Sequence, residues 1–183
     1  QIAVNDEVEG LLAGWTSTRV DLDDFTDPIN GTDVVAAQAD LFPALDAGSG
    51  LTWYLGHSAA SYWSDQVLFG SSEVATRTGP PTALAQFGCW NTYYVAPDVD
   101  TLAHALLLHP TSGAALVMGS TTLTSASGDI AFGKLLAAQL ASGSVTVGEA
   151  VLAAKQALLA QGGGGLADIE LGWTILGDPA IVV

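Results

Sequence analysis

Three short apolar runs limit most strongly how this chain can fold. The run at residues 113–119, GAALVMG, is continuously apolar rather than alternating, which predicts a strand buried on both faces. The runs at residues 51–55 (LTWYL) and 82–87 (TALAQF) have the aromatic and aliphatic content of further strands. Longer stretches of helical character separate these runs. The alternation predicts one α/β domain over residues 1–183, with three layers (α/β/α) and a mostly parallel sheet.

The remaining elements are expected from apolar spacing and from turn residues. Helices are predicted at residues 6–15, 32–45, 100–108, 129–140 and 147–160. Further extended segments are predicted at residues 18–22, 173–176 and 180–183.

Composition excludes several classes of function. Four Lys and Arg residues stand against 19 Asp and Glu, which gives a net charge of −15 and leaves no basic surface for nucleic acid. No apolar run approaches the roughly 18 residues that a membrane span needs. The single cysteine excludes a disulfide within the chain and a multi-thiolate metal site. Neither a metal nor a cofactor is expected. Scarce lysine and abundant aspartate favour an extracellular or cell-surface location.

Two reactive side chains follow predicted strands, each directly after a glycine. His57 comes after the run at residues 51–55, and Cys89 comes after the run at residues 82–87. In parallel sheets, ligands bind beyond the carboxyl ends of the strands. The intervening residues 58–81 are long enough for a crossover between parallel neighbours. The two side chains would then lie over one rim of the sheet, as a nucleophile and its base require. Backbone N–H groups of Ser58 and Cys89 are the candidate donors to an oxyanion.

Structural roles remain open for the same residues. His57 could be a hydrogen-bonded histidine at the sheet edge, and Cys89 a small buried side chain. Asn91 could order the loop after Cys89 or simply form a turn. His104 and His109 are expected on the surface or in packing.

Four ordered segments resemble the gingipain-type cysteine peptidases. Residues 51–63, LTWYLGHSAASYW, resemble the segment that carries the catalytic histidine, and residues 86–91, QFGCWN, resemble the nucleophile segment. Residues 113–120, GAALVMGS, resemble the strand beside the specificity pocket, and residues 173–179, WTILGDP, resemble the closing strand. The resemblance implies a caspase-like fold, with His57 as general base and acid and Cys89 as nucleophile.

The substrate pocket is less well defined by this resemblance. Its expected lining is Trp63, Phe87, Thr121 and Thr122. The chain has Ser58 where the family usually has glycine and Ala60 where an acidic residue is frequent, and residues 121–128 contain no counterpart of the family's pocket tryptophan. Asp65 could favour a basic substrate residue or could be a solvated loop acid.

The beginning of the chain also departs from the family's pattern. A caspase-like sheet begins with a central strand that precedes the first helix, whereas this chain starts at that helix. We therefore expect an upstream segment of the same precursor to complete the sheet. The other expected partner is a protein or peptide substrate.

Three classes of function follow from these patterns. The first is a cysteine endopeptidase that forms a thioester acyl-enzyme, with self-processing as one variant. The alternative is a non-catalytic surface or structural module that keeps the peptidase fold. A generic α/β hydrolase or nucleotide-binding domain is disfavoured because neither a Gly-x-Ser-x-Gly elbow nor a dinucleotide glycine fingerprint is present.

Two minor motifs have plain alternatives. Asn30-Gly31-Thr32 matches the glycosylation acceptor pattern, which also arises by chance. The acidic group Asp21, Asp23, Asp24 and Asp27 could bind calcium through oxygen ligands, but it lacks the EF-hand spacing, and a solvated turn is the favoured interpretation.

Overall fold

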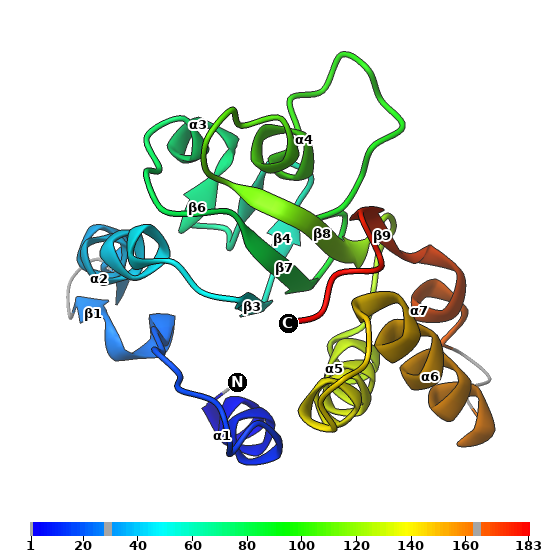
Figure 1. The fold of residues 1–183 in the computed structure, drawn as a ribbon. Helices are drawn as coiled ribbons and strands as arrows, with labels where there is room; N and C mark the ends of the chain where they lie inside the picture. Colours follow the sequence, from blue (N-terminus) through cyan, green and yellow to red (C-terminus); the bar gives the residue numbers. More distant parts are fainter. Residues whose placement is uncertain (1, 28–30, 163–165) are drawn as a thin grey trace.

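A four-stranded sheet forms the centre of the molecule (Figure 1). The computed structural model describes residues 2–27, 31–162 and 166–183. In spatial order the strands are β3 (Leu51–Leu55), β7 (Thr82–Phe87), β8 (Ala114–Ser120) and β9 (Trp173–Gly177). The first three run parallel, and β9 runs antiparallel to β8. The predicted mostly parallel sheet is therefore confirmed.

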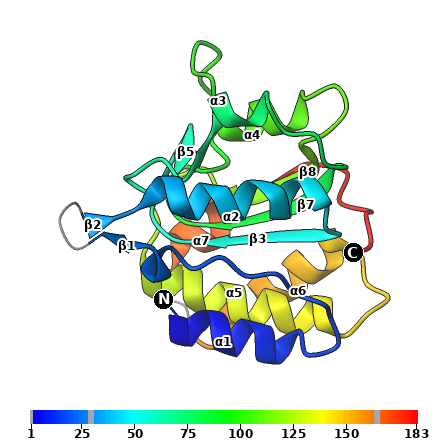
Figure 2. The same ribbon diagram turned by 90° about the vertical axis from the view of Figure 1, so that its left-hand side faces the viewer.

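Helices cover both faces of this sheet (Figure 2). One face packs against α5 (Ala126–Ala141), α6 (Val147–Ala160) and α7 (Ala167–Gly172), with α1 (Ile2–Leu11) lying against α5. The other face is covered by α2 (Val34–Ala47), α3 (Ser71–Val74) and α4 (Leu102–Leu107). Three layers result, as the alternation of strands and helices predicts.

Aromatic rings fill the core on the α5 side. Phe87 and Phe132 both pack against Trp173, with ring centroids 5.3 and 4.7 Å apart, and all three side chains are almost completely buried. Burying an aromatic side chain of this size contributes about 2–3 kcal/mol. Leu84 and Val117, which point to the opposite face, belong to the second core beneath α4. The two cores fix the sheet from both sides.

Several helices begin with a side-chain cap. The Ser125 hydroxyl accepts a hydrogen bond from the Gly128 N–H and starts α5 at Ala126. Thr146 and Glu149 form a capping box at the start of α6. Each such cap is worth about 1 kcal/mol.

Short elements complete the chain. A 3₁₀ turn (Leu22–Asp24) precedes the hairpin of β1 (Thr26–Asp27) and β2 (Gly31–Thr32). A second, antiparallel sheet follows β3 and comprises β4 (Ser58–Ala59), β5 (Tyr62–Trp63) and β6 (Phe69–Gly70). This small sheet forms part of the predicted crossover between β3 and β7.

The predicted element bounds agree best in the core. The strands at 51–55 and 82–87 and the helix at 147–160 have the predicted limits, whereas the first helix covers Ile2–Leu11 instead of residues 6–15. The strand predicted at residues 18–22 is wrong: residues 18–21 are irregular, Leu22 begins the 3₁₀ turn, and Arg19 forms an ion pair with Asp21. Residues 180–183 are also not a strand. Within the described part of the chain, neither segment forms backbone pairing with a strand of a sheet.

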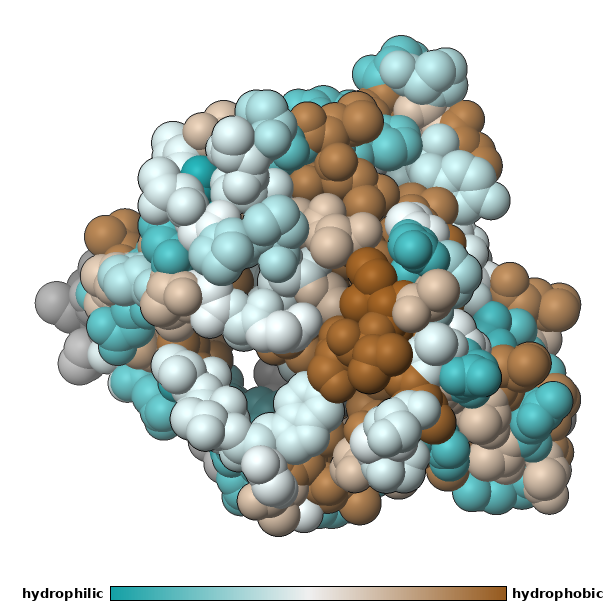
Figure 3. Space-filling model, in the orientation of Figure 1, coloured by the Kyte–Doolittle hydropathy of each residue, from teal (hydrophilic) through white to brown (hydrophobic). Residues whose placement is uncertain are grey.

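The outer edge of β3 has no paired strand among the described residues. Its inner edge pairs with β7, and β3 ends the spatial order of the sheet. Figure 3 shows an opening in the surface beside this edge, between β3 and the segment that follows α1. An unpaired edge strand presents a row of backbone N–H and C=O groups to which another strand can bind.

Candidate active site

Strand pairing brings the two reactive loops together. Leu55 of β3 lies opposite Phe87 of β7, and the Gly56 N–H donates to the Phe87 carbonyl at 2.9 Å. His57 and Cys89 each follow two residues after this pair. Both residues therefore leave the sheet at the same rim, from adjacent parallel strands.

The approach of the two loops requires glycine at position 88. A Cβ atom on Gly88 would lie 2.2 Å from the Gly56 carbonyl oxygen and 2.5 Å from the Ser58 hydroxyl oxygen. Atoms at such distances overlap, so a side chain at this position would force the loops apart. The Ser58 hydroxyl also donates to the Cys89 carbonyl at 2.8 Å, which holds the loops in this contact.

The backbone of His57 is held firmly although its side chain is exposed. Its carbonyl oxygen accepts hydrogen bonds from the Tyr54 hydroxyl at 2.5 Å and from the Ser64 N–H at 2.7 Å. Burial raises the pKa of Tyr54 well above its usual value, so this hydroxyl remains a proton donor. The Tyr54 ring in turn stacks on Trp63 at a centroid distance of 4.3 Å.

A buried asparagine joins three strand ends beneath the rim. The Asn91 amide nitrogen donates to the Gly88 carbonyl at 2.9 Å and to the Ser58 hydroxyl at 3.3 Å, and its oxygen accepts from the Ser120 N–H at 3.0 Å. A Cβ atom on Gly119 would lie 2.2 Å from that oxygen, so only glycine leaves it room. Asn91 thus orders the loop after Cys89, which is one of its two predicted roles.

The residue after Cys89 has an unusual backbone conformation. Trp90 has a φ of 59°, in the left-handed region that non-glycine residues rarely adopt, at a cost of about 1–3 kcal/mol. Its N–H donates to the Thr122 carbonyl at 3.0 Å, and its ring packs edge-on against Tyr93. These contacts hold the sharp turn that follows the thiol.

The sulfur of Cys89 lies against the loop that leads into α5. The Thr124 N–H donates to Sγ at 3.4 Å, and the Thr124 carbonyl oxygen is 3.6 Å from Sγ. The Thr124 hydroxyl donates to the Asp129 carboxylate at 2.6 Å. Burial raises the pKa of Asp129 to about 6, and the hydrogen bond from Thr124 opposes this shift.

The residues expected to line a pocket fall into two groups. Thr121 and Thr122 are half-buried at the end of β8, and Thr122 contacts the turn after Cys89. Trp63 and Phe87 are interior residues, 2% and 0% exposed, whose contacts are those of core packing. A contact of either ring with a substrate stays a prediction. Asp65 is exposed.

The sequence predicts no role for Thr124 or Asp129, two residues near the thiol. The predicted helix begins at residue 129, which places Asp129 at its first position. The helix in fact begins at Ala126, and this places Asp129 inside its first turn with only 4% of its surface exposed. The available signal is Ser125, because serine is a preferred residue at the N-cap of a helix.

The other candidate features supply no second site. Asp23 and Asp24 are exposed in the 3₁₀ turn, and no group of three or more His, Cys, Asp or Glu residues in the described ranges could hold a metal ion. Asn30 lies outside the described residues. No helix in the described part of the chain has the length and apolar character needed to cross a membrane.

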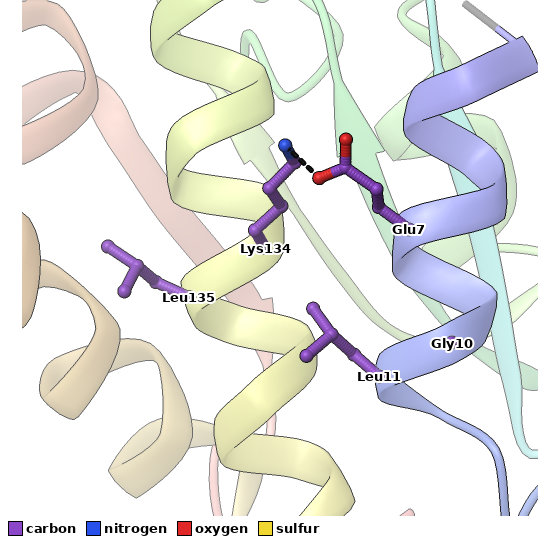
Figure 4. A pocket seen from close by; sticks show the side chains of 5 residues that line it. All are labelled: Glu7, Gly10, Leu11, Lys134 and Leu135. Atoms are coloured by element: carbon purple, nitrogen blue, oxygen red, sulfur yellow. Dashed lines mark ion pairs between the residues drawn. The ribbon is translucent and has the colours of Figure 1, made fainter.

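A surface groove lies away from these loops, between α1 and α5 (Figure 4). Its lining consists of Glu7, Gly10, Leu11, Lys134 and Leu135. Glu7 and Lys134 form an ion pair across it. The groove contains neither His57 nor Cys89, so it is separate from the candidate active site.

Comparisons with solved structures agree with this fold. The chain is 18% identical to the Arg-specific cysteine proteinase gingipain R (RgpB), with a TM-score of 0.78 over 100% of this chain and 42% of that one. It is 22% identical to a chain in the complex of Porphyromonas gingivalis RgpB pro- and mature domains, with a TM-score of 0.70 over 80% of this chain and 37% of that one. Another solved protease structure is 15% identical, with a TM-score of 0.67 over 77% of this chain and 37% of that one.

The chain thus spans about two fifths of the length of these structures. No curated protein sequence matches it. The sequence profile of peptidase family C25 matches residues 3–183, which is nearly the whole chain. The chain therefore belongs to peptidase family C25.

Proposed function

We propose that this chain carries the catalytic residues of a cysteine endopeptidase, with Cys89 as nucleophile and His57 as general base and acid. The observation that carries the proposal is the register of β3 and β7, which brings both loops to one rim and joins them through the Ser58–Cys89 hydrogen bond. Membership of family C25 supports it. The exposed side chain of His57 and the partly exposed Cys89 leave both groups open to a substrate.

The reaction that these groups support is acyl transfer. His57 takes the thiol proton, and the Cys89 sulfur attacks the peptide carbonyl carbon to give a tetrahedral oxyanion. The C–N bond then breaks as His57 gives that proton to the departing amine, which leaves a thioester on Cys89. Water, deprotonated by His57, attacks the thioester, and the acid and the free thiol are released.

Backbone donors stabilise the oxyanion in this scheme. The Cys89 N–H has no protein acceptor among the described residues, so it is free to donate to a substrate oxygen. The neighbouring Ser58 N–H is the second donor. Removing one donor of this kind typically costs about 3 kcal/mol in the activation free energy.

The pocket beside the nucleophile is proposed to include Thr121 and Thr122. Both lie at the end of β8, and the Trp90–Thr122 hydrogen bond links this strand end to the loop of Cys89. Asp65 is the candidate for attracting a basic substrate residue, a preference that would match the Arg-specific proteinase with the same fold. Cleavage of a peptide library without preference for Arg or Lys would discard this role.

An upstream segment of the precursor is proposed to pair with the free edge of β3. The outer edge of β3 has no paired strand among the described residues, and one structure with this fold is a complex of pro- and mature domains. Self-processing would separate the two pieces while leaving them associated. We place such a protein outside the cell or on its surface.

One observation favours the alternative of a non-catalytic module. The Cys89 sulfur is hydrogen-bonded to Thr124, and the His57 ring makes no hydrogen bond within the described residues. A protein that kept the fold for binding alone would tolerate this arrangement. Such a protein would show no difference between the reactivity of Cys89 with and without the imidazole.

Alkylation of Cys89 by iodoacetamide separates the two functions. In the peptidase, the wild-type thiol reacts fast near neutral pH and His57→Ala slows it by at least roughly tenfold, because the imidazole no longer favours the thiolate. The matched control is His104→Ala on α4, which leaves the rate unchanged. Equal, slow labelling of wild type and His57→Ala would overturn the proposed dyad.

A further inference from the structure

The environment of the Cys89 sulfur is built largely by one residue. The Thr124 N–H, carbonyl oxygen and hydroxyl oxygen lie 3.4, 3.6 and 3.8 Å from Sγ. The N–H can stabilise a thiolate, and the carbonyl can accept a proton from a neutral thiol. Thr124 therefore contacts both protonation states of the sulfur, and the orientation of its hydroxyl decides which state it favours.

That orientation depends on Asp129. The Thr124 hydroxyl donates to one oxygen of the carboxylate at 2.6 Å, and the other oxygen is buried with no hydrogen-bond partner among the described residues. A buried acceptor without a partner is costly, and protonation of the carboxyl relieves part of this cost. The pair is thus set up to exist in two hydrogen-bonded states.

In the first state Asp129 is ionised. The Thr124 hydroxyl must donate to it, which turns a lone pair toward Sγ and favours the neutral thiol. In the second state Asp129 carries a proton and donates it to the Thr124 oxygen. The Thr124 proton is then free to point at the sulfur, and this hydrogen bond favours the thiolate.

We propose that Asp129, acting through the Thr124 hydroxyl, is a positioning residue that sets the reactivity of the Cys89 thiol. The inference rests on the proposed role of Cys89 as nucleophile. On this proposal, the ionised carboxylate of Asp129 lowers peptidase activity, and activity rises when that carboxylate is neutralised.

The burial of Asp129 makes this effect relevant near neutral pH, because its raised pKa of about 6 puts both states within reach. The elements packed against α5 carry other titratable groups, namely Asp6, Glu7 and Glu9 on α1, Glu149 and Lys155 on α6, and Asp168 and Glu170 on α7. Glu7 pairs with Lys134 on α5 itself, and the Lys155 amine donates to backbone carbonyls. Within the described residues, the hydrogen bond to the Asp129 carboxylate comes from Thr124 alone.

The test is the rate of iodoacetamide labelling of Cys89 from pH 5 to 9, followed by intact mass on the whole chain. Asp129→Asn removes the charge and is expected to raise the rate at pH 7 roughly three- to tenfold, since each unit of thiol pKa changes the thiolate fraction up to tenfold. Thr124→Ser keeps the hydroxyl and should label as wild type. Asp168→Asn, an exposed acid in the first turn of α7, is the matched control and should also label as wild type.

The double variant shows whether Thr124 carries the effect. In a Thr124→Val background, Asp129→Asn should change the rate less than twofold, because the hydroxyl that links the two groups is absent. An undiminished effect in that background would overturn the proposal, as would wild-type labelling by Asp129→Asn at every pH. If Asp129→Asn fails to fold, Thr124→Val alone decides: the labelling profile should lose its step near pH 6, and an unchanged profile would overturn the proposal.

The same experiment keeps the two proposals apart. Slow labelling of His57→Ala together with no effect of Asp129→Asn would refute the role of Asp129 and leave the dyad standing. Wild-type labelling of His57→Ala together with faster labelling of Asp129→Asn would refute the dyad while supporting control of the thiol by Asp129.

Discussion

The Ser58 hydroxyl donates a 2.8 Å hydrogen bond to the Cys89 carbonyl, across the gap between two loops that are 31 residues apart in sequence. Ser58 directly follows His57, so the bond ties the position of the imidazole to that of the nucleophile. The same hydroxyl accepts from Asn91, which connects it to the third strand of the sheet. A serine where related peptidases usually have glycine thus acquires a structural role.

Ser58→Ala should loosen this contact. Loss of one partly buried hydrogen bond is expected to lower the free energy of unfolding by about 1 kcal/mol, and peptidase activity should fall further because the loops are no longer held together. Urea unfolding and peptide hydrolysis measure the two effects. Ser72→Ala, which removes an exposed hydroxyl that donates to the neighbouring Glu73 carboxylate, is the control and should change neither. Full activity of Ser58→Ala would show that the bond does not position the loops.

Gly88→Ala tests the close approach of the loops directly. The added Cβ would lie 2.2 Å from the Gly56 carbonyl oxygen, a backbone atom that cannot move without disturbing β3. We expect the free energy of unfolding to fall by about 1–3 kcal/mol. In the Gly88→Ala background, His57→Ala should no longer slow the iodoacetamide labelling of Cys89. Gly10→Ala in α1 has no atom within 4 Å of the new Cβ and should be neutral or slightly stabilising. Equal stability of the two variants would contradict the close contact between the loops.

Asp129 should make stability depend on pH. Its folded-state pKa of about 6 lies above the value of about 4 expected for an unfolded chain, so the folded state binds the proton more tightly. The stabilisation that comes from this proton is present below pH 4 and is lost as the pH rises through 6. Asp129→Asn should therefore be more stable than wild type at pH 7.5, by up to about 3 kcal/mol, with a smaller difference at pH 4.

Thermal unfolding at the two pH values measures this difference. Asp168→Asn should show no such trend, since that acid is exposed. A difference between Asp129→Asn and wild type that stays constant from pH 4 to 7.5 would mean that Asp129 has an ordinary pKa in the folded protein.

The sequence predicts the main sheet and the position of the reactive loops because both depend on strong local signals. Continuous apolar runs identify β3, β7 and β8, and glycines mark where the chain turns toward His57 and Cys89. The small sheet after His57 escapes prediction, because two-residue strands are too short for an alternating pattern. The error at residues 18–22 has a different cause: a strand needs a partner, and β-propensity alone does not supply one.

The surroundings of the thiol depend on tertiary contacts that no local pattern encodes. Asn91 is a common turn residue, and only its complete burial between strand ends reveals its role. The sequence predicts that the helix starts at residue 129, whereas α5 starts at Ala126, so that Asp129 lies within the first turn, where tertiary packing buries it. Thr124 carries no sequence signal at all, since its importance comes from the fold of the loop onto Cys89.

Capture of the acyl-enzyme tests the central claim most directly. The chain is incubated with a short peptide p-nitrophenyl ester, quenched in acid, and analysed by intact mass and peptide mapping. We predict an acyl adduct on Cys89 that forms within the burst of nitrophenol release, is absent in Cys89→Ala and forms much more slowly in His57→Ala. An adduct that forms equally fast without His57, or turnover that survives in Cys89→Ala, would contradict a Cys89–His57 peptidase.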